Sequence, residues 1–248
     1  MKKYFQAPWS LKDVFHITIT VILIFILITG FLNMLNLEDL LEGSKYTSLF
    51  LSFGILLQGL ISILVVLYFT KKKYKKINLR DFGFKKIGVW KSILAILSAY
   101  FVYIGITIII AAIIYHFKVE IPGYEVQENI LELFGETNLD LIFAGIAIVL
   151  IAPIAEEVFF RGFFLRALSN KWGIYYGSIA SALVFSFLHY PWQSFIPIFI
   201  LGLIINSLVI RYKSIWPAIG FHIFNNGIVF IIQVLIMKDV ISLDQLIN

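Results

Sequence analysis

Residues 151–168 have the sequence IAPIAEEVFFRGFFLRAL, which sets two adjacent carboxylates and an arginine inside an otherwise apolar run. A charged side chain at the centre of a membrane helix costs roughly 2.5–3.5 kcal/mol on insertion scales. Glu156, Glu157 and Arg161 therefore need a physical reason to be there. The surrounding phenylalanine, isoleucine and leucine residues predict a helix that continues through the charged patch to Leu168.

The composition places this stretch in a membrane protein. The chain has 248 residues, is 60% hydrophobic and 17% aromatic, and has a mean hydropathy of +0.92, far above soluble averages. We expect an all-α polytopic transmembrane helical bundle that forms a single integral-membrane domain over residues 1–248. Apolar runs of sufficient length predict about seven spans, within a range of about six to eight, at 14–35, 47–69, 92–116, 141–168, 174–190, 194–210 and 214–236. The first run is too long for a signal-peptide core and lacks a cleavage site, so it is expected to be a retained span.

The charges between the spans predict their orientation in the cell membrane. Residues 70–91 are strongly basic, with Asp81 as their single acidic residue, so the positive-inside rule places them in the cytoplasm. With alternating spans, the N-terminus is then cytoplasmic and the C-terminus is outside. The basic residues therefore report membrane topology, and nucleic acid is not expected as a partner.

The connection at 118–138 is acidic and is expected outside. Within it, Val126, Ile130, Leu131 and Phe134 recur at helical spacing, which predicts a short helix lying on the membrane surface.

The charged residues of the central stretch differ in the faces they occupy on a helix. Glu157 and Arg161 are four residues apart, in the favourable order of acid before base, so they can form an ion pair. Glu156 points about 100° away from this pair. It must be protonated, bound to other polar groups or held beside water. A simpler alternative is that Glu157 and Arg161 form a salt bridge that only stabilises helix packing, with Glu156 as an additional acid at a helix end.

Further polar residues lie in the later apolar runs. His189 lies in VFSFLHY and His222 in IGFHIFNNGIVF, whereas His16 and His116 lie at span ends, where an interfacial position is expected. Asn226 follows His222 by four residues and Phe185 precedes His189 by four, so each pair shares a helix face. At about 1.5 Å per residue, Glu156 lies roughly 18 Å, His189 roughly 22 Å, His222 roughly 12 Å and Asn226 roughly 18 Å from the predicted cytoplasmic surface. These depths predict that the four side chains share one layer.

A carboxylate, two imidazoles and an amide in one layer suit peptide hydrolysis by activated water. Glu156 could act as the base, one histidine could orient the water, and the other histidine could bind the oxyanion with Asn226. Alternatively, Glu156, His189 and His222 could hold Zn²⁺ with an open position for water. The chain has no cysteine, no HExxH and no Gly-x-Ser-x-Gly, which excludes thiolate sites and argues against those protease classes.

The three motifs together resemble the CPBP family of CAAX proteases and bacteriocin-processing enzymes, which includes type II prenyl-protein endopeptidases. The resemblance covers about residues 139–230 and rests on Glu156-Glu157-x-x-x-Arg161, Phe185-x-x-x-His189 and His222-x-x-x-Asn226. It implies that Glu156 and His189 activate water and that His222 and Asn226 bind the oxyanion. It also implies that Glu157 and Arg161 are a supporting pair, next to Phe185. Members of the family are described both as metalloproteases and as metal-free glutamate proteases; the pairing of His222 with Asn226 favours no metal, with zinc as the alternative.

The expected function is hydrolysis of a peptide bond in a membrane-associated peptide or protein precursor. A lysine- and isoleucine-rich chain is typical of bacteria, so a bacteriocin or pheromone precursor is a more natural substrate than a prenylated CAAX protein. The alternatives are a non-enzymatic membrane scaffold or regulator, or a protein of bacteriocin self-immunity. Retention of all four polar residues argues against a scaffold, because packing alone does not require them.

Overall fold

The computed structural model describes residues 7–36, 46–118, 130–189 and 194–241, and all regular secondary structure in these ranges is helical. The first helices are α2 (Leu11–Met34), α4 (Thr47–Lys73) and α5 (Val89–Phe117), followed by the 3₁₀ helix η1 (Ile130–Leu133). A long segment follows, composed of α6 (Asn138–Gly145), η2 (Ile146–Ile151), α7 (Ala152–Glu157), η3 (Val158–Phe164) and α8 (Leu165–Phe187). The last helices are α9 (Phe195–Tyr212) and α10 (Trp216–Met237). This confirms the all-α class.

Six helices in the described residues are long and apolar enough to cross a membrane, so this is a multi-pass membrane protein. The sequence predicted about seven because residues 141–168 and 174–190 were counted as separate spans. The count of six takes Asn138–Phe187 as one segment, but two helices meet within it across a break at Gly173, where φ is 81°, between the two predicted runs. A Cβ on Gly177 would lie 2.6 Å from the Ser169 nitrogen. Because residues eight apart in a straight helix are roughly 12 Å apart, the helix bends sharply at Gly173.

The helix continues through the charged patch, as the sequence predicted, but it becomes π-helical on both sides of α7. Segments η2 and η3 are π-helical, and the short α-helix α7 lies between them. π-helical turns are rare and are often found at functional sites. The change in winding alters which residues share a face after Glu157.

The chain packs as two compact units. The first unit contains Met1–Val14, Thr70–Glu128 and Glu157–His222; the second contains Phe15–Phe69, Asn129–Glu156 and Ile223–Asn248. Both units draw on early and late parts of the chain, so neither is a separate stretch of sequence.

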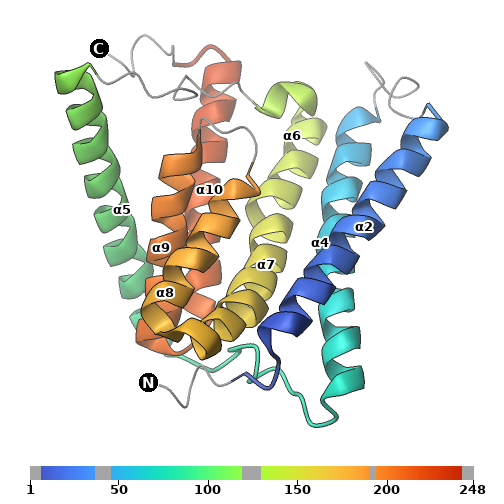
Figure 1. Cartoon of the computed structure of the whole chain (residues 1–248). Coiled ribbons are helices and arrows are strands. Elements are labelled where there is room, and N and C mark those ends of the chain that lie inside the picture. Colours follow the sequence, from blue (N-terminus) through green and yellow to red (C-terminus); the bar gives the residue numbers. More distant parts are fainter. Residues whose placement is uncertain (1–6, 37–45, 119–129, 190–193, 242–248) are drawn as a thin grey trace. The chain divides into compact units, whose positions relative to one another are not determined.

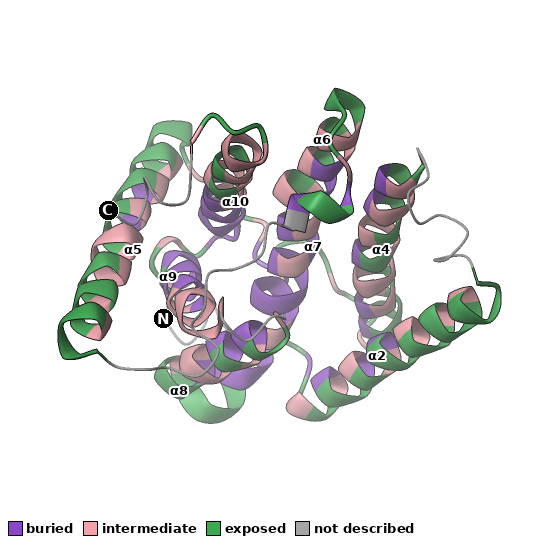
Figure 2. Cartoon of the chain, turned by 90° about the horizontal axis from the view of Figure 1, so that it is seen from above, coloured by how far each residue is buried: buried purple, intermediate pink, exposed green. Residues whose placement is uncertain are grey.

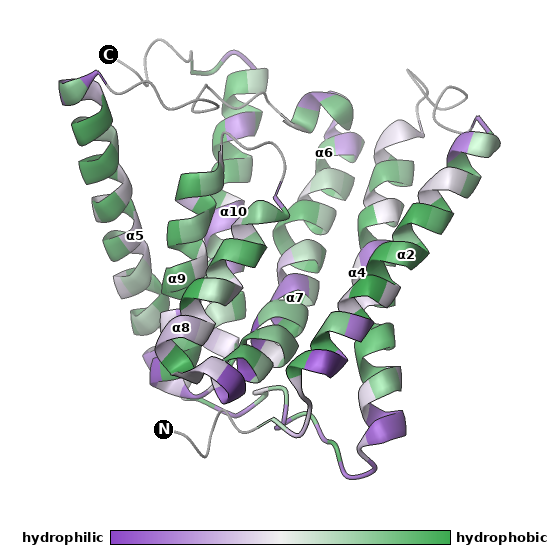
Figure 3. Cartoon of the chain, viewed as in Figure 1, coloured by the Kyte–Doolittle hydropathy of each residue, from purple (hydrophilic) through white to green (hydrophobic). Residues whose placement is uncertain are grey.

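In the first unit, α8 and α9 lie side by side (Figure 1). Segment η3 and the first turn of α8 hold its most continuous buried stretch (Figure 2). Helix α5 is strongly apolar (Figure 3), yet its buried residues are the two small residues Ala95 and Ala99, and its larger apolar side chains are at least partly exposed. Exposed apolar side chains on a membrane helix are suited to face lipid.

Contacts in the first unit bring together segments that the sequence predicted to be cytoplasmic. The Ser214 hydroxyl donates to the Lys85 carbonyl at 2.7 Å, and the Asn170 amide donates to the Ala7 carbonyl at 3.0 Å. The loop after α4 therefore meets the turn before α10, and the N-terminal segment meets the start of α8.

The second unit groups segments that were expected outside. The Ser48 hydroxyl donates to the Asp140 carboxylate, which also completes a capping box with Thr137 at the start of α6. Nearby, the Lys238 ammonium donates to the Glu136 carbonyl at 2.7 Å.

The prediction of a surface helix near residue 130 differs from the structure. Val126 lies outside the described residues, and the described part is one short 3₁₀ helix. Leu131 and Phe134 do not face the membrane surface but form a buried cluster with Ala144 in the second unit. An amphipathic pattern predicts that a face is buried, but it does not distinguish lipid from protein as the environment.

Candidate active site

The centre of the first unit is a buried ion pair. The Arg161 Nη1 donates to the Glu157 Oε1 at 3.0 Å, and both side chains are 0% exposed. This is the pair that the four-residue spacing predicted. Removing one partner of a buried pair costs about 3–5 kcal/mol, because the other charge is left uncompensated.

The same carboxylate oxygen has a second partner that the sequence did not reveal. His222 Nδ1 lies 2.9 Å from Glu157 Oε1, and the imidazole is 3% exposed. The two residues are 65 positions apart in the chain. Glu157 thus connects the central stretch to the histidine of α10, in addition to neutralising Arg161.

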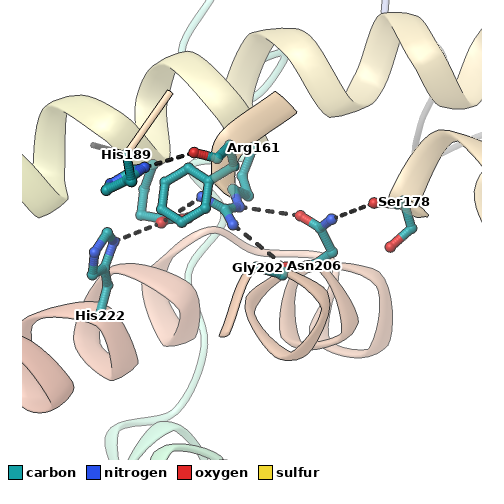
Figure 4. A network of polar contacts seen from close by, with 8 residues as sticks. Arg161, Ser178, His189, Gly202, Asn206 and His222 are labelled. Carbon is teal, nitrogen blue, oxygen red and sulfur yellow. Dashed lines mark hydrogen bonds and ion pairs between the residues drawn. The ribbon is translucent and has the colours of Figure 1, made fainter. Parts of the chain in front are cut away.

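Arg161 is held further by α9 (Figure 4). Its Nε donates to the Asn206 side-chain oxygen at 3.1 Å and its Nη2 to the Gly202 carbonyl at 3.4 Å. The Asn206 amide in turn donates to the Ser178 carbonyl of α8 at 2.9 Å. Sequence reasoning missed Asn206, although an asparagine inside an apolar span is itself a signal of a buried polar contact.

Phe185 lies between the arginine and the two histidines. It is fully buried, and the Arg161 guanidinium carbon lies 4.2 Å from its ring centroid, which is a cation–π distance. The ring centroids of His189 and His222 lie 4.3 Å and 5.9 Å from that of Phe185. The structure therefore brings Glu157, Arg161, Phe185, His189 and His222 into one cluster.

Hydrogen bonds fix the proton position on both imidazoles. His189 Nδ1 lies 2.6 Å from the Phe185 carbonyl oxygen, which can only accept, so this nitrogen carries a proton. His222 Nδ1 likewise donates to the Glu157 carboxylate. In the neutral form of each ring, Nε2 then has the lone pair.

Glu156 and Asn226 belong to the second unit and are described within it. Glu156 is half-buried. At the preceding residue, Ala155, the Cβ atom would lie only 2.9 Å from a Cβ added to Gly59 of α4. Helices α4 and α7 therefore approach closely one residue before Glu156. Asn226 is half-buried, and its amide donates to the Ile148 carbonyl of η2 at 3.1 Å. The second amide proton of Asn226 is not used in this bond.

The zinc alternative would require Glu156, His189 and His222 as ligands. Among residues 7–36, 46–118, 130–189 and 194–241, no three His, Asp or Glu side chains form a group that could hold a metal ion. Imidazoles whose Nδ1–H is fixed by a carbonyl or carboxylate are also typical of metal ligands, so the donor chemistry of the two histidines fits either version. The preference for a metal-free site stays a prediction.

Comparison with known proteins identifies relatives of this part of the chain. Residues 138–228 match the model of a family described as type II CAAX prenyl endopeptidase Rce1-like. The chain is 34% identical over 113 residues to the UPF0177 protein YbdI of Lactococcus lactis, covering 45% of this chain and 60% of that protein. It is 27% identical over 173 residues to the "Putative membrane peptidase YdiL" of Bacillus subtilis, covering 70% of this chain and 68% of that protein. No solved structure matches the chain significantly.

The family match spans the Glu157–Arg161 ion pair, Phe185 of α8 and His189 directly after that helix, and His222 and Asn226 of α10. These are the motifs on which the resemblance to CAAX proteases was based. Residues 138–228 of this multi-pass membrane protein are thus similar to the Rce1-like type II CAAX prenyl endopeptidases, which confirms the resemblance predicted from the sequence.

Proposed function

We propose that this protein is an intramembrane endopeptidase that hydrolyses a peptide bond in a membrane-associated peptide or protein precursor. The observation that carries the proposal is the hydrogen bonding of two histidines through Nδ1, one to Glu157 and one to the Phe185 carbonyl. Because Nδ1 of each ring is engaged, Nε2 is the ring nitrogen that can contact water or substrate. Both histidines lie inside the region that matches an endopeptidase family.

In the proposed mechanism, Glu156 and His189 activate one water molecule. Glu156 takes a proton from the water as the water oxygen attacks the peptide carbonyl carbon, and His189 Nε2 orients that water. The carboxyl group of Glu156 then gives the proton to the amide nitrogen as the carbon–nitrogen bond breaks. The role of Glu156 rests on its position in the motif and on the need for a carboxylate separate from the Arg161 pair.

The negative charge that develops on the carbonyl oxygen needs hydrogen-bond donors. We assign this role to His222 and to the second amide proton of Asn226. Glu157 supports this role because its carboxylate accepts the Nδ1–H of His222 and so fixes the orientation of the ring. No metal is needed for this sequence of steps; in the zinc version, Glu156, His189 and His222 would instead bind the ion.

We propose a bacteriocin or pheromone precursor as the substrate, with a CAAX-like protein as the less favoured choice. The lactococcal and Bacillus relatives are bacterial proteins, which supports a bacterial substrate. The orientation proposed for the chain has its N-terminus in the cytoplasm.

The proposal is tested by co-expressing the protein with candidate precursor peptides encoded by neighbouring genes and detecting cleaved products by mass spectrometry. We expect a cleaved product with the wild-type protein, and loss of at least about a hundredfold in cleavage rate with Glu156→Gln, since the base is removed. Glu132→Gln is a matched control, because Glu132 is exposed and lies outside the motif. Full activity of a well-folded Glu156→Gln variant would exclude this mechanism, and cleavage of none of the precursors would favour the scaffold alternative.

A further inference from the structure

The segment before α2 is held firmly within the first unit. The Trp9 indole donates to the Phe163 carbonyl at 3.0 Å, and its ring is stacked on Phe82 with 4.8 Å between centroids. Trp9 is only 1% exposed. Together with the bond from Asn170 to the Ala7 carbonyl, these contacts fix the backbone of Ala7–Trp9 at the start of α8.

A second set of contacts joins this segment to the end of α4. The Asp13 carboxylate accepts hydrogen bonds from the Ser10 amide at 2.7 Å, from the Tyr74 hydroxyl at 2.7 Å and from the Lys73 ammonium. Asp13 thereby neutralises Lys73. In the described ranges, Lys75 and Lys76 are exposed and have no ion-pair partner.

Between these two fixed segments lies a cavity of about 530 Å³. One wall is formed by Ala7 and Pro8, and the other by residues 74–77, with Asp81 at its edge. Its lining residues include the apolar Pro8 and Ile77 and the basic Lys75 and Lys76. The Asp81 carboxylate is partly engaged, because it accepts a hydrogen bond from the Asn78 amide at 2.8 Å.

The position of the cavity limits what can occupy it. It begins directly after Lys73, the last residue of the apolar helix α4, and so lies where the membrane-spanning part of that helix meets water. The most abundant anions at this depth are the phosphates of lipid headgroups. Clusters of Lys and Arg next to a membrane helix attract anionic lipids.

We propose that this cavity binds the headgroup of an anionic phospholipid, with its phosphate between Lys75 and Lys76 and its glycerol and first methylenes against Pro8 and Ile77. The site differs from the general basic character of residues 70–91, because it has a defined volume and two walls held in place, one by the buried Trp9 and the other by the hydrogen bonds of Asp13 to Lys73 and Tyr74. It does not depend on the peptidase activity.

The test is native mass spectrometry of the full chain, purified in detergent, with phosphatidylglycerol or phosphatidylcholine of the same acyl chains. We expect preferential retention of phosphatidylglycerol, and we expect the double substitution Lys75→Gln with Lys76→Gln to weaken it by about tenfold or more. The matched control is Lys71→Gln with Lys86→Gln, which removes the same charge from exposed positions outside the cavity. In this control we expect a change of less than about twofold.

Three results would overturn the proposal: equal retention of the two lipids, equal weakening by both double substitutions, or displacement of the lipid by excess inorganic phosphate. The second would mean that diffuse charge attracts the lipid, and the third that the site takes free phosphate. Asp81→Asn gives an independent check, because removal of a negative charge from the edge of the cavity should tighten binding of phosphatidylglycerol. Unchanged or weaker binding by this variant would contradict the assignment.

Discussion

Glu157 is fully buried and bonded to both Arg161 and His222, so its substitution should affect stability as well as activity. We expect Glu157→Gln to lower the free energy of unfolding by about 3–5 kcal/mol, because Arg161 is left as an uncompensated buried charge. Thermal unfolding and abundance in the membrane measure this effect. Glu156→Gln is the comparison, and we expect it to leave abundance normal. Equal abundance of the two variants would show that the ion pair does not stabilise the fold.

Asn226 is assigned to the oxyanion, and its loss should therefore affect turnover more than folding. We expect Asn226→Ala to lower kcat by about a hundredfold or more, as loss of an oxyanion donor does. Asn226 also donates to the Ile148 carbonyl, so a thermal unfolding measurement is needed to separate the two effects. A variant with unchanged kcat would remove Asn226 from the proposed mechanism.

The choice between water activated by Glu156 and zinc-bound water gives a distinct prediction. We expect purified protein to keep its activity after exhaustive chelation, because His222 acts as a donor in the metal-free version. Metal content by mass spectrometry should be measured on the same sample. Stoichiometric zinc, with activity lost on stripping and restored by adding zinc back, would make Glu156, His189 and His222 ligands.

The bend at Gly173 depends on close packing between the two arms of the helix. A Cβ on Gly177 would meet the Ser169 nitrogen at 2.6 Å and its Cα at 2.8 Å, and both are backbone atoms that cannot move aside. Gly177→Ala should therefore destabilise the protein by about 1–3 kcal/mol, despite the better helix propensity of alanine.

Gly105 in α5 provides the control for this prediction, since nothing lies within 4 Å of a Cβ at that position. We expect Gly105→Ala to be neutral or slightly stabilising. The comparison requires only thermal unfolding of the two variants. A Gly177→Ala variant as stable as Gly105→Ala would show that the arms can separate without cost.

The topology of the whole chain follows from charge and from the grouping of segments within each unit. A reporter fused after Lys76 should be cytoplasmic, and one fused near Glu128 should be extracytoplasmic. In the first unit, the loop after α4 meets the turn before α10, so a reporter after Lys213 should agree with the one after Lys76. A different side for either of these two reporters would contradict the arrangement of the first unit.

The sequence by itself determined the membrane class, the helices and the Glu157–Arg161 pair. These depend on local properties: hydropathy over a span and the spacing of residues on a single helix. The family resemblance was also accessible, because three short motifs occur in a fixed order. The connection between the fourth and fifth predicted spans was not, since a sharp bend at one glycine with a positive φ joins them directly.

Only the tertiary structure decided the partners between helices. From the sequence, Glu157 was expected only to pair with Arg161, but its carboxylate also accepts a hydrogen bond from His222 of α10. Asn206 of α9 accepts a further hydrogen bond from Arg161. Such contacts depend on how each helix is rotated about its axis, and hydropathy does not fix this rotation in chains that are apolar on most faces. The π-helical winding of η3 changes the rotation again within the motif itself. For this reason the identity of the residues could be predicted, but their pairing could not.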